Sequence, residues 1–397
     1  MVMGTWRRLL LAMVGGVAVA SIYTAQPVLE PMGHDLGIPA EHTGWIVATA
    51  QIGYLAGLIL LMPLGDVLDR RKLIATHLAL TAAGMILTAA ANTAWTALTG
   101  LAAAGLFAVV VQTTVAYAAT ISAPDERGKN IAAVVSGVVI GILGGRILAG
   151  ALTDIWGWRS TYLVLATLAL ALTALVLAAL PTDHRPQPPA RYTQALAALG
   201  GLFRQRLFLT RGLIAFFLFA SFATLWSGIA LPLAAAPWHL TESQIGLIGI
   251  AGLAGALGAG RAGRWADAGH ARTATGIALI LLIASWAGIA QLPRSLWPLA
   301  AGILLLDFAV QLAHVSNQHL LATAHPDRTS TAIGGYMIFY SLGSALGAAT
   351  TTAVHTTAGW TAASLLGAAF AACGLATWAI DRHLPTRSTP AERTSAH

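Results

Sequence analysis

Charge is scarce in this chain. Only 9% of its 397 residues are Asp, Glu, Lys or Arg, whereas an ordinary soluble domain carries about 25%. So few charged side chains could not cover the surface of a soluble protein of this length. Hydrophobic residues make up 57% of the chain and form long blocks separated by short polar stretches. Because one helical crossing of a bilayer takes about 20 apolar residues, the sequence predicts an all-α polytopic membrane protein.

Cysteine is almost absent as well, which excludes several kinds of site. Cys373 is the one cysteine, so disulfides and cysteine metal sites are excluded. The twelve histidines show no HExxH-like spacing, and no G-x-x-x-x-G-K-[ST] motif is present, so we expect no metal, no cofactor and no ATP-driven pump. A polytopic membrane enzyme, a remote alternative, would need catalytic residues clustered near one interface, and the short loops carry none. We therefore expect that the protein is not an enzyme.

The apolar blocks predict twelve transmembrane helices in two six-helix bundles. A proline-rich basic stretch, beginning PTDHRPQPPARYTQ, interrupts the chain halfway and is typical of a linker. The predicted domains are residues 1–180, a cytoplasmic linker at 181–207, and 208–397 with a short cytoplasmic tail. The predicted spans are 9–30, 43–65, 73–92, 94–121, 129–153, 160–180, 208–233, 243–262, 273–291, 295–322, 330–354 and 360–381.

The positions of the basic residues predict the orientation in the membrane. Of the 22 lysines and arginines, all fall on the side of the termini and the linker except Arg159 and Arg294 in opposite loops and Arg146 inside a span. This is the positive-inside pattern, so both termini should be cytoplasmic in a multi-pass protein of the plasma (inner) membrane. The net charge of +7 forms no contiguous basic patch with aromatics, so no nucleic-acid partner is expected. We expect a monomer in the lipid bilayer.

The first apolar block also resembles a signal peptide, with Arg7 and Arg8 before it. A signal peptide has a short apolar run followed by a polar mature region. Here the apolar run continues to about Leu29 and eleven more blocks follow. The sequence therefore favours a first transmembrane helix.

The two halves of the chain share an internal pattern. At an offset of 202 residues, Gly141 and Gly145 fall on Gly343 and Gly347, and Gly157-Trp158 falls on Gly359-Trp360. The shared order of several pairs at corresponding helix ends predicts two parallel repeats. Transporters recurrently use this plan, with the binding site between the halves near the midplane.

The loop after the second predicted helix, PLGDVLDRRKL, carries a recognisable motif. It resembles the signature G-x-x-x-D-R-x-G-R-[RK] of the major facilitator superfamily at Gly65, Asp69 and Arg70, although the later glycine is missing. We expect Gly65 at a close turn, and Asp69 against a neighbouring helix N-terminus or a basic residue such as Arg127. Such charge contacts can break during a conformational change and so act as a gate.

The fifth predicted helix, SGVVIGILGGRILAG, is similar to the glycine-rich motif of drug:proton antiporters, the multidrug efflux branch of that superfamily. Gly137, Gly141 and Gly145 match, while Ile142 replaces the proline and Arg146 replaces the final glycine. Small residues at this spacing permit close packing against another helix.

The tenth predicted helix holds a polar stripe in the stretch LLLDFAVQLAHVSNQ. Asp307, Gln311, His314 and Gln318 lie within about 60° of one another on a helix. Asp307 would lie ~15 Å from the outer end, near the midplane, where a charge costs about 2.5–3.5 kcal/mol. The stripe is therefore predicted to face water, substrate or other helices rather than lipid. Arg146 is predicted to lie farther toward the outside.

The superfamily resemblance implies that helices 1, 4, 7 and 10 line a central cavity. That would give a mixed polar and aromatic pocket with few charges, suited to a modest-sized amphipathic substrate. The candidate cavity residues, besides Gln311 and Gln318, are Tyr23, Gln26, Gln112, Thr113, Tyr117, Ser221 and Trp226.

Our leading hypothesis is a secondary active transporter that works by alternating access and exports small organic molecules or drugs in exchange for protons. A carboxylate in a low dielectric binds a proton more readily, so Asp307 is the candidate proton carrier and His314 a possible relay. A purely structural Asp307, bonded to another helix, stays open as an alternative. So does an importer or facilitator of a sugar, nucleoside or similar metabolite.

Overall fold

The structure is a computed structural model that describes residues 4–122, 127–182, 192–258, 270–325 and 329–383, and these contain helices and no strand. Within these described residues, ten helices are long and apolar enough to cross a membrane, and the last of them, Thr331–His383, contains two helices joined at Gly359. The predicted eighth span is the interrupted helix described next. These spanning helices confirm the predicted all-α polytopic fold.

The N-terminal half consists of α1 (Thr5–Tyr23), α2 (Leu29–Asp35), α3 (Gly44–Leu60), α4 (Arg70–Ala89), α5 (Ala94–Phe107), α6 (Val110–Ile121), α7 (Arg127–Trp156) and α8 (Trp158–Ala179). After α9 (Tyr192–Leu202), the C-terminal half consists of α10 (Arg206–Gly228), α11 (Ala230–Ala234), α12 (Glu242–Leu247), α13 (Gly249–Gly258), α15 (Ala271–Ile289), α16 (Leu296–Ala324) and α17 (Thr329–His383). Several predicted spans are interrupted, among them the fourth between α5 and α6, the seventh between α10 and α11, and the eighth at Ile248, with 259–262 outside the described residues.

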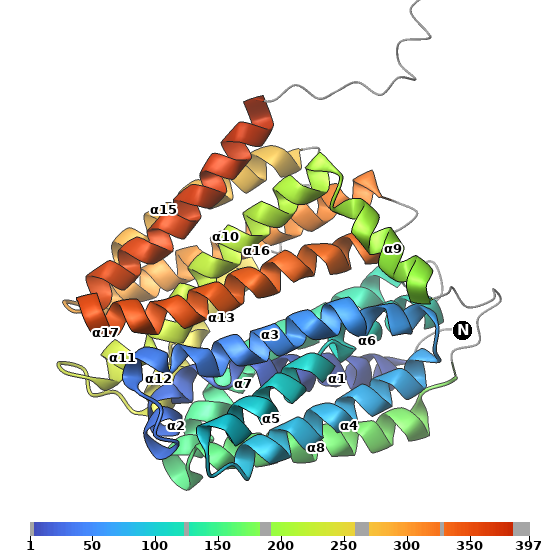
Figure 1. Cartoon of the computed structure of the whole chain (residues 1–397), viewed down its shortest axis with the longest axis horizontal. Coiled ribbons are helices and arrows are strands. Elements are labelled where there is room, and N and C mark those ends of the chain that lie inside the picture. The colour runs from blue at the N-terminus through green and yellow to red at the C-terminus, as the bar shows by residue number, and fades with distance from the viewer. Residues whose placement is uncertain (1–3, 123–126, 183–191, 259–269, 326–328, 384–397) are drawn as a thin grey trace, which may run out of the picture.

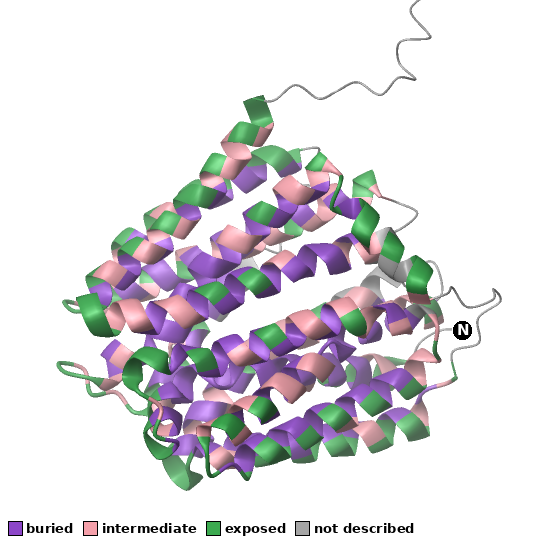
Figure 2. Cartoon of the chain, in the orientation of Figure 1, coloured by how far each residue is buried: buried purple, intermediate pink, exposed green. Residues whose placement is uncertain are grey.

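The halves form two bundles that meet along α3 and α17, and also where α12 packs on α7 (Figure 1). We call the end that carries the start of α1 and the helix α9 the linker end, and the opposite end the far end. Exposed positions follow the outer faces of both bundles, while buried positions concentrate inside each bundle and between the two (Figure 2). Exposed leucines and isoleucines such as Ile140 and Leu365 are as expected for helices that contact lipid.

The internal repeat predicted from the sequence exists in three dimensions. Gly157 and Gly359 both have positive φ, at 80° and 77°, and each turns the chain between two helices at the far end. A side chain other than glycine rarely adopts this conformation. In each half, the helix before this glycine also packs closely against the first helix of that half. A β-carbon on Gly141 would lie 2.2 Å from the carbonyl oxygen of Gly16 in α1, and one on Gly343 would lie 2.0 Å from that of Phe216 in α10.

Candidate functional site

Asp307 lies near the middle of α16 and is only 5% exposed, whereas Leu304 on another face of the helix is 46% exposed. Gln311, His314 and Gln318 follow Asp307 on its face and are partly buried. The polar stripe thus faces the protein interior. Because an isolated charge is costly at this depth, the groups around Asp307 decide what the carboxyl can do.

Arg146, the residue that departs from the fifth-helix motif, is buried between the halves. It is 2% exposed. Its Nε donates to Oε1 of Gln26 at 2.9 Å, and its guanidinium stacks over the ring of Trp226, with 3.9 Å from Cζ to the ring centroid. Tyr23 and Phe222 lie farther away, at 5.6 and 5.8 Å. Residues from both halves therefore surround one positive charge.

The charges of Arg146 and Asp307 interact electrostatically, yet no ion pair within 4.0 Å joins these two described residues. The two terminal nitrogens of Arg146 and Oδ2 of Asp307 are buried and have no hydrogen-bond partner in the protein. The indole nitrogen of Trp226 lies near the carboxyl but also lacks a bond of normal geometry. Buried polar groups usually have hydrogen-bond partners. These unpaired atoms are therefore suited to bind one further polar group.

The depth predicted for Arg146 was too shallow. The fifth span was predicted to end at residue 153, but α7 continues to Trp156, so Arg146 lies about 15 Å from the far end of its helix. Asp307 lies about 16 Å from the start of α16. The two residues are therefore at similar depths.

Glycines in α12 and α13 form the wall beside this pair. A β-carbon on Gly252 would lie 2.8 Å from Trp226 and 2.9 Å from Oδ2 of Asp307, and one on Gly246 would lie 2.9 Å from the carbonyl oxygen of Arg146. Only a residue without a side chain lets the helix approach so closely. We did not predict this stripe, although the sequence carries a glycine at every third position from 246 to 258.

Amides and phenols extend the site into the N-terminal half. Tyr23 interacts with Gln51, Tyr54 and Arg146, and Nε2 of Gln112 donates to the Tyr54 hydroxyl at 3.1 Å. Of the predicted cavity residues, the structure thus places Tyr23, Gln26 and Trp226 around Arg146, with Gln112 bonded to the neighbouring Tyr54.

His314 belongs to a second group, about 10 Å along α16 from Asp307. Its Nδ1 lies 3.1 Å from the Tyr336 hydroxyl, and its Nε2 lies 3.0 Å from Nε2 of Gln318. The ring of Phe219 packs edge-on against the imidazole, with 5.1 Å between the ring centroids. Both ring nitrogens have partners, so His314 bridges α16 and α17.

Three other predicted residues lie apart from the Arg146–Asp307 pair. The Tyr117 hydroxyl donates to the carbonyl of Pro181 at 2.6 Å, near the linker end of the N-terminal half. Ser221 accepts from the Trp286 indole and donates to Gly367, both at 2.9 Å, within the C-terminal half. Thr113 is buried in α6 and takes no part in the described contacts of the pair.

The residues of the loop motif after α3 mostly contact one another. Asp69 caps its own helix, accepting from the backbone N–H of Arg71 at 2.8 Å, rather than the neighbouring helix that we expected. Arg70 donates to the carbonyl of Gly65 at 3.0 Å and to Thr120 of α6 at 2.7 Å. Gly65 lies in the 3-10 turn Met62–Asp66 that follows α3, but a β-carbon there would meet nothing within 4 Å, so this turn does not need glycine for space. The side chain of Arg127 lies outside the described residues.

The fifth-helix glycines pack against α1. A β-carbon on Gly137 would lie 2.2 Å from the Ala12 carbonyl oxygen, and one on Gly145 would lie 3.0 Å from the Ala20 side chain. This close packing brings α7 near enough to α1 for Arg146 to reach Gln26.

At the far end, Asp154 of α7 caps a helix of the other half. Its two carboxylate oxygens accept from the backbone N–H groups of Glu242 and Ser243, at 3.1 and 3.0 Å. A carboxylate is favourable at a helix N-terminus. Burial raises the pKa of the Glu242 carboxyl, and the hydrogen bond and charge of Asp154 add to this effect. We did not single out Asp154 from the sequence.

Thr352 makes a second contact between the halves at the far end. Its hydroxyl accepts from the backbone N–H of Gly44 at 3.1 Å and donates to the carbonyl of Glu41 at 3.1 Å. Together with Asp154, Thr352 connects the two halves at the far end by hydrogen bonds that a conformational change can break.

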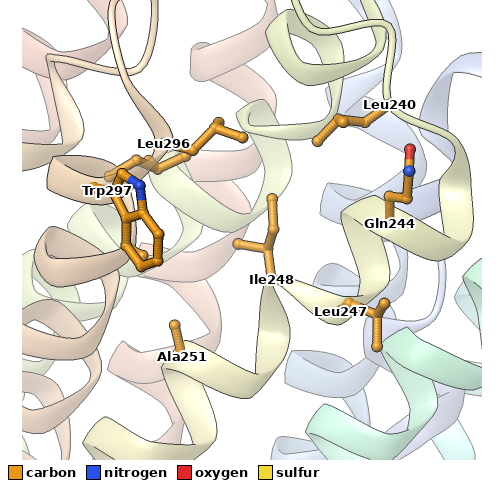
Figure 3. A pocket seen from close by; sticks show the side chains of 9 residues that line it. Leu240, Gln244, Leu247, Ile248, Ala251, Leu296 and Trp297 are labelled. Atoms are coloured by element: carbon orange, nitrogen blue, oxygen red, sulfur yellow. The ribbon is translucent and has the colours of Figure 1, made fainter.

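An apolar pocket of about 480 Å³ lies on the other side of α12 and α13 (Figure 3). Ile248 and Ala251 line it next to the glycines that touch the buried pair, and Leu296 and Trp297 of α16 close the opposite side. Its lining is almost entirely apolar, so an aliphatic or aromatic group would fit it.

Curated relatives of this chain are named as transporters. It is 39% identical over 370 residues to a putative uncharacterized transporter of Escherichia coli, covering 93% of this chain and 94% of the relative. A probable transporter of Streptomyces coelicolor is 30% identical over 346 residues, covering 86% of this chain and 79% of that protein.

Solved structures share the fold. The nucleoside transporter NupG superposes with a TM-score of 0.75 at 13% identity, over 94% of this chain and 98% of that one. A human organic anion transporter gives 0.69 at 16% identity, over 95% and 100%. The family model of the Major Facilitator Superfamily matches residues 11–230 and 211–397. The chain therefore belongs to the Major Facilitator Superfamily and has its membrane transporter fold.

Proposed function

We propose that this protein is a proton-coupled exporter of small amphipathic organic molecules, of the drug:proton antiporter type. One observation carries the proposal. Asp307 and Arg146, from opposite halves, are buried at similar depths and interact by charge, but they form no ion pair within 4.0 Å. Such a pair can bind and release a proton and a ligand. In a closed salt bridge, each of the two groups would already have its partner.

The proposed coupling uses the attraction between these charges. When Asp307 is ionised, Arg146 attracts it across the boundary between the halves, and this attraction is strong in a low dielectric. A proton on Asp307 removes the attraction, which favours separation of the halves. When water reaches Asp307 again, the carboxyl loses its proton. The attraction to Arg146 then favours the closed arrangement of the two halves. Each cycle would thus move a proton one way and substrate the other.

The substrate class follows from the chemistry around Arg146. An aromatic or weakly anionic group can replace part of the stack between Arg146 and Trp226, and the amides of Gln26, Gln51 and Gln112 can bind polar substituents. The apolar pocket beside α13 (Figure 3) supports an amphipathic rather than a fully polar substrate. His314, with both nitrogens bonded, is better suited to bridge helices than to relay protons.

In this proposal the protein is a monomer in the plasma (inner) membrane, with the linker end and both termini in the cytoplasm. The hydrogen bonds of Asp154 and Thr352 then close the outer side. Import or facilitated diffusion of a nucleoside or sugar is the second candidate. The amide-rich side of the site favours it, because amides suit substrates with hydroxyl groups.

The test uses purified protein in proteoliposomes with an imposed pH gradient and a panel of amphipathic drugs, nucleosides and sugars. We expect Asp307→Asn to insert and fold, because the substitution removes a charge cost of about 2.5–3.5 kcal/mol. It should lose gradient-driven accumulation by tenfold or more, roughly a 1.4 kcal/mol effect, while substrate still exchanges down its own gradient.

The matched control is Asp35→Asn, which removes an exposed carboxylate at the far end that pairs with Arg159. Exposed pairs contribute little, so this variant should transport normally. Accumulation by Asp307→Asn at the wild-type rate per folded molecule would exclude Asp307 as the proton carrier. A fall in proportion to protein level would favour a structural role.

A further inference from the structure

A polar pocket of about 330 Å³ lies at the linker end of the C-terminal half, formed by α10, α15 and α17. Asn317, which borders it, lies about 15 Å along α16 from Asp307, so the pocket is separate from the proposed transport site. Its lining residues are Arg211, Arg272, Thr273, Trp378, Asp381 and Arg382.

The floor of this pocket is a rigidly held arginine. The side chain of Arg211 is 1% exposed and forms an ion pair with Asp381 of α17. Its NH1 also donates to Oδ1 of Asn317 at 3.3 Å. Nε of Arg211 and Nδ2 of Asn317 are buried and have no hydrogen-bond partner in the protein. The structure thus fixes a buried guanidinium whose donors are only partly used.

Positive charge exceeds negative charge among the lining residues. Three guanidinium groups line the pocket with one carboxylate, and Asp381 is shared with Arg206, whose NH2 lies 3.5 Å from Oδ1. Arg272 lies close enough to Arg211 for the two like charges to interact. An anion between the guanidinium groups would relieve this repulsion, and their planar forks match phosphate oxygens.

The pocket lies at the level expected for the membrane interface. The indole N–H of Trp378 donates to the carbonyl of Arg272 at 2.8 Å, and Arg382 lies over the Trp378 ring at 5.6 Å. Two residues from Trp378, Ile380 is 61% exposed, as expected for a lipid-facing side chain. Tryptophans at helix ends typically lie at the depth of the lipid headgroups.

We propose that this pocket binds the phosphate of an anionic phospholipid headgroup, which Arg272 and Arg382 contact above the buried Arg211. Basic pockets between transmembrane helices bind such headgroups. Bound there, the lipid would join α10, α15 and α17 at the linker end.

The test measures lipid binding to the purified full chain in neutral detergent by native mass spectrometry. Phosphatidylglycerol and phosphatidylcholine with identical acyl chains are added in turn, and we expect phosphatidylglycerol to bind more tightly. Arg272→Gln and Arg382→Gln, both at exposed side chains, should each weaken phosphatidylglycerol binding about fivefold, since one basic residue near the surface contributes about 1 kcal/mol. Arg294→Gln, which removes an exposed arginine at the far end, should leave it unchanged.

A second arm separates lipid from a soluble anion. Inorganic phosphate should protect the protein against heat no better than chloride at equal ionic strength, because it lacks the acyl chains that hold a lipid at the pocket. The lipid assignment would be overturned if inorganic phosphate protected the protein in a way that depends on Arg272 and phosphatidylglycerol did not bind. Equal affinity for the two lipids, or insensitivity to both glutamine substitutions, would overturn the proposal as a whole.

Discussion

At the scale of single residues, the position of Arg146 defines the candidate site. The sequence showed that this arginine takes the place of the final glycine in an antiporter-like motif, but not what it touches. The structure places its guanidinium on the Trp226 ring and against Gln26, within reach of the Asp307 charge. A planar guanidinium can stack and donate at once, which a lysine ammonium cannot do.

Arg146→Lys therefore keeps the positive charge but removes the planar group that stacks on Trp226 and donates to Gln26. We expect it to lower the free energy of unfolding by about 1–3 kcal/mol, from the buried cation–π contact and one hydrogen bond, and to slow transport. The control Arg159→Lys changes an exposed arginine that lies 4.4 Å from the Trp158 ring centroid, and it should cost less than about 1 kcal/mol. Circular dichroism during thermal unfolding measures both. Equal stability of the two variants would contradict a stacking role for Arg146.

At the scale of elements, the glycine stripe of α12 and α13 explains how a helix reaches the buried pair. Two glycines three residues apart on this stripe have different surroundings. A β-carbon on Gly252 would lie under 3.0 Å from Trp226 and Asp307, whereas the atom nearest to a β-carbon on Gly249 would be Cδ of Arg146, at 4.0 Å.

Gly252→Ala should thus move the helix away from the site and cost about 1–3 kcal/mol by overpacking, with transport reduced tenfold or more. Gly249→Ala should keep transport and gain about 0.5–1 kcal/mol, because alanine favours the helix over glycine. Transport assays and thermal unfolding on both variants give the comparison. Normal transport in Gly252→Ala would show that α13 does not need this close approach.

At the scale of the whole molecule, alternating access requires the contacts at the far end to break. Asp154 holds the N-terminus of α12 from the other half, and losing a cap of this kind costs about 1 kcal/mol. Asp154→Ala should raise the population with an open far end about fivefold. The control Asp35→Ala changes a far-end carboxylate that bonds only within its own half, to Arg159 and Trp158.

The measurement is the distance between spin labels on Trp95→Cys and Trp297→Cys, exposed far-end positions in the two halves, in a Cys373→Ser background. Because the pKa of Glu242 is raised in the closed contact, closure takes up a proton there. The open population should therefore grow as the pH rises through the pKa of Glu242, and Glu242→Gln should remove this part of the pH dependence; the pKa of Asp154 is lowered in the same contact and acts in the opposite direction at lower pH. An unchanged distance distribution in Asp154→Ala would rule out Asp154 as a gate.

The orientation of the molecule gives a separate prediction. Green fluorescent protein fused after the last residue, or inserted near Pro188, should fluoresce, because both positions fall in basic parts of the sequence that we expect to be cytoplasmic. The same insertion in the far-end loop between α15 and α16, near Arg294, should remain dark. Fluorescence of the loop insertion, or its absence at either of the other two positions, would contradict the twelve-span topology.

The membrane class, the all-α fold, the internal repeat and the inward face of the Asp307 stripe were predicted from the sequence alone. Each of these depends on local composition, helical periodicity or the spacing of glycines, and the positive φ of Gly157 and Gly359 at matching positions fits that spacing. The motif did not reveal that Asp69 caps its own helix or that Gly65 has free space around it, because a motif does not say which backbone lies nearby.

Only the tertiary structure decided which distant residues meet. It put Arg146 on Trp226, set Asp154 at the start of α12, and separated Tyr117 from the other cavity candidates. Such contacts depend on helix ends and crossing angles. A shift of three residues in the end of α7 moves Arg146 by about 4.5 Å, enough to place it beside or away from Asp307. Hydrophobic periodicity fixes the face of a helix, but packing between helices fixes what that face touches.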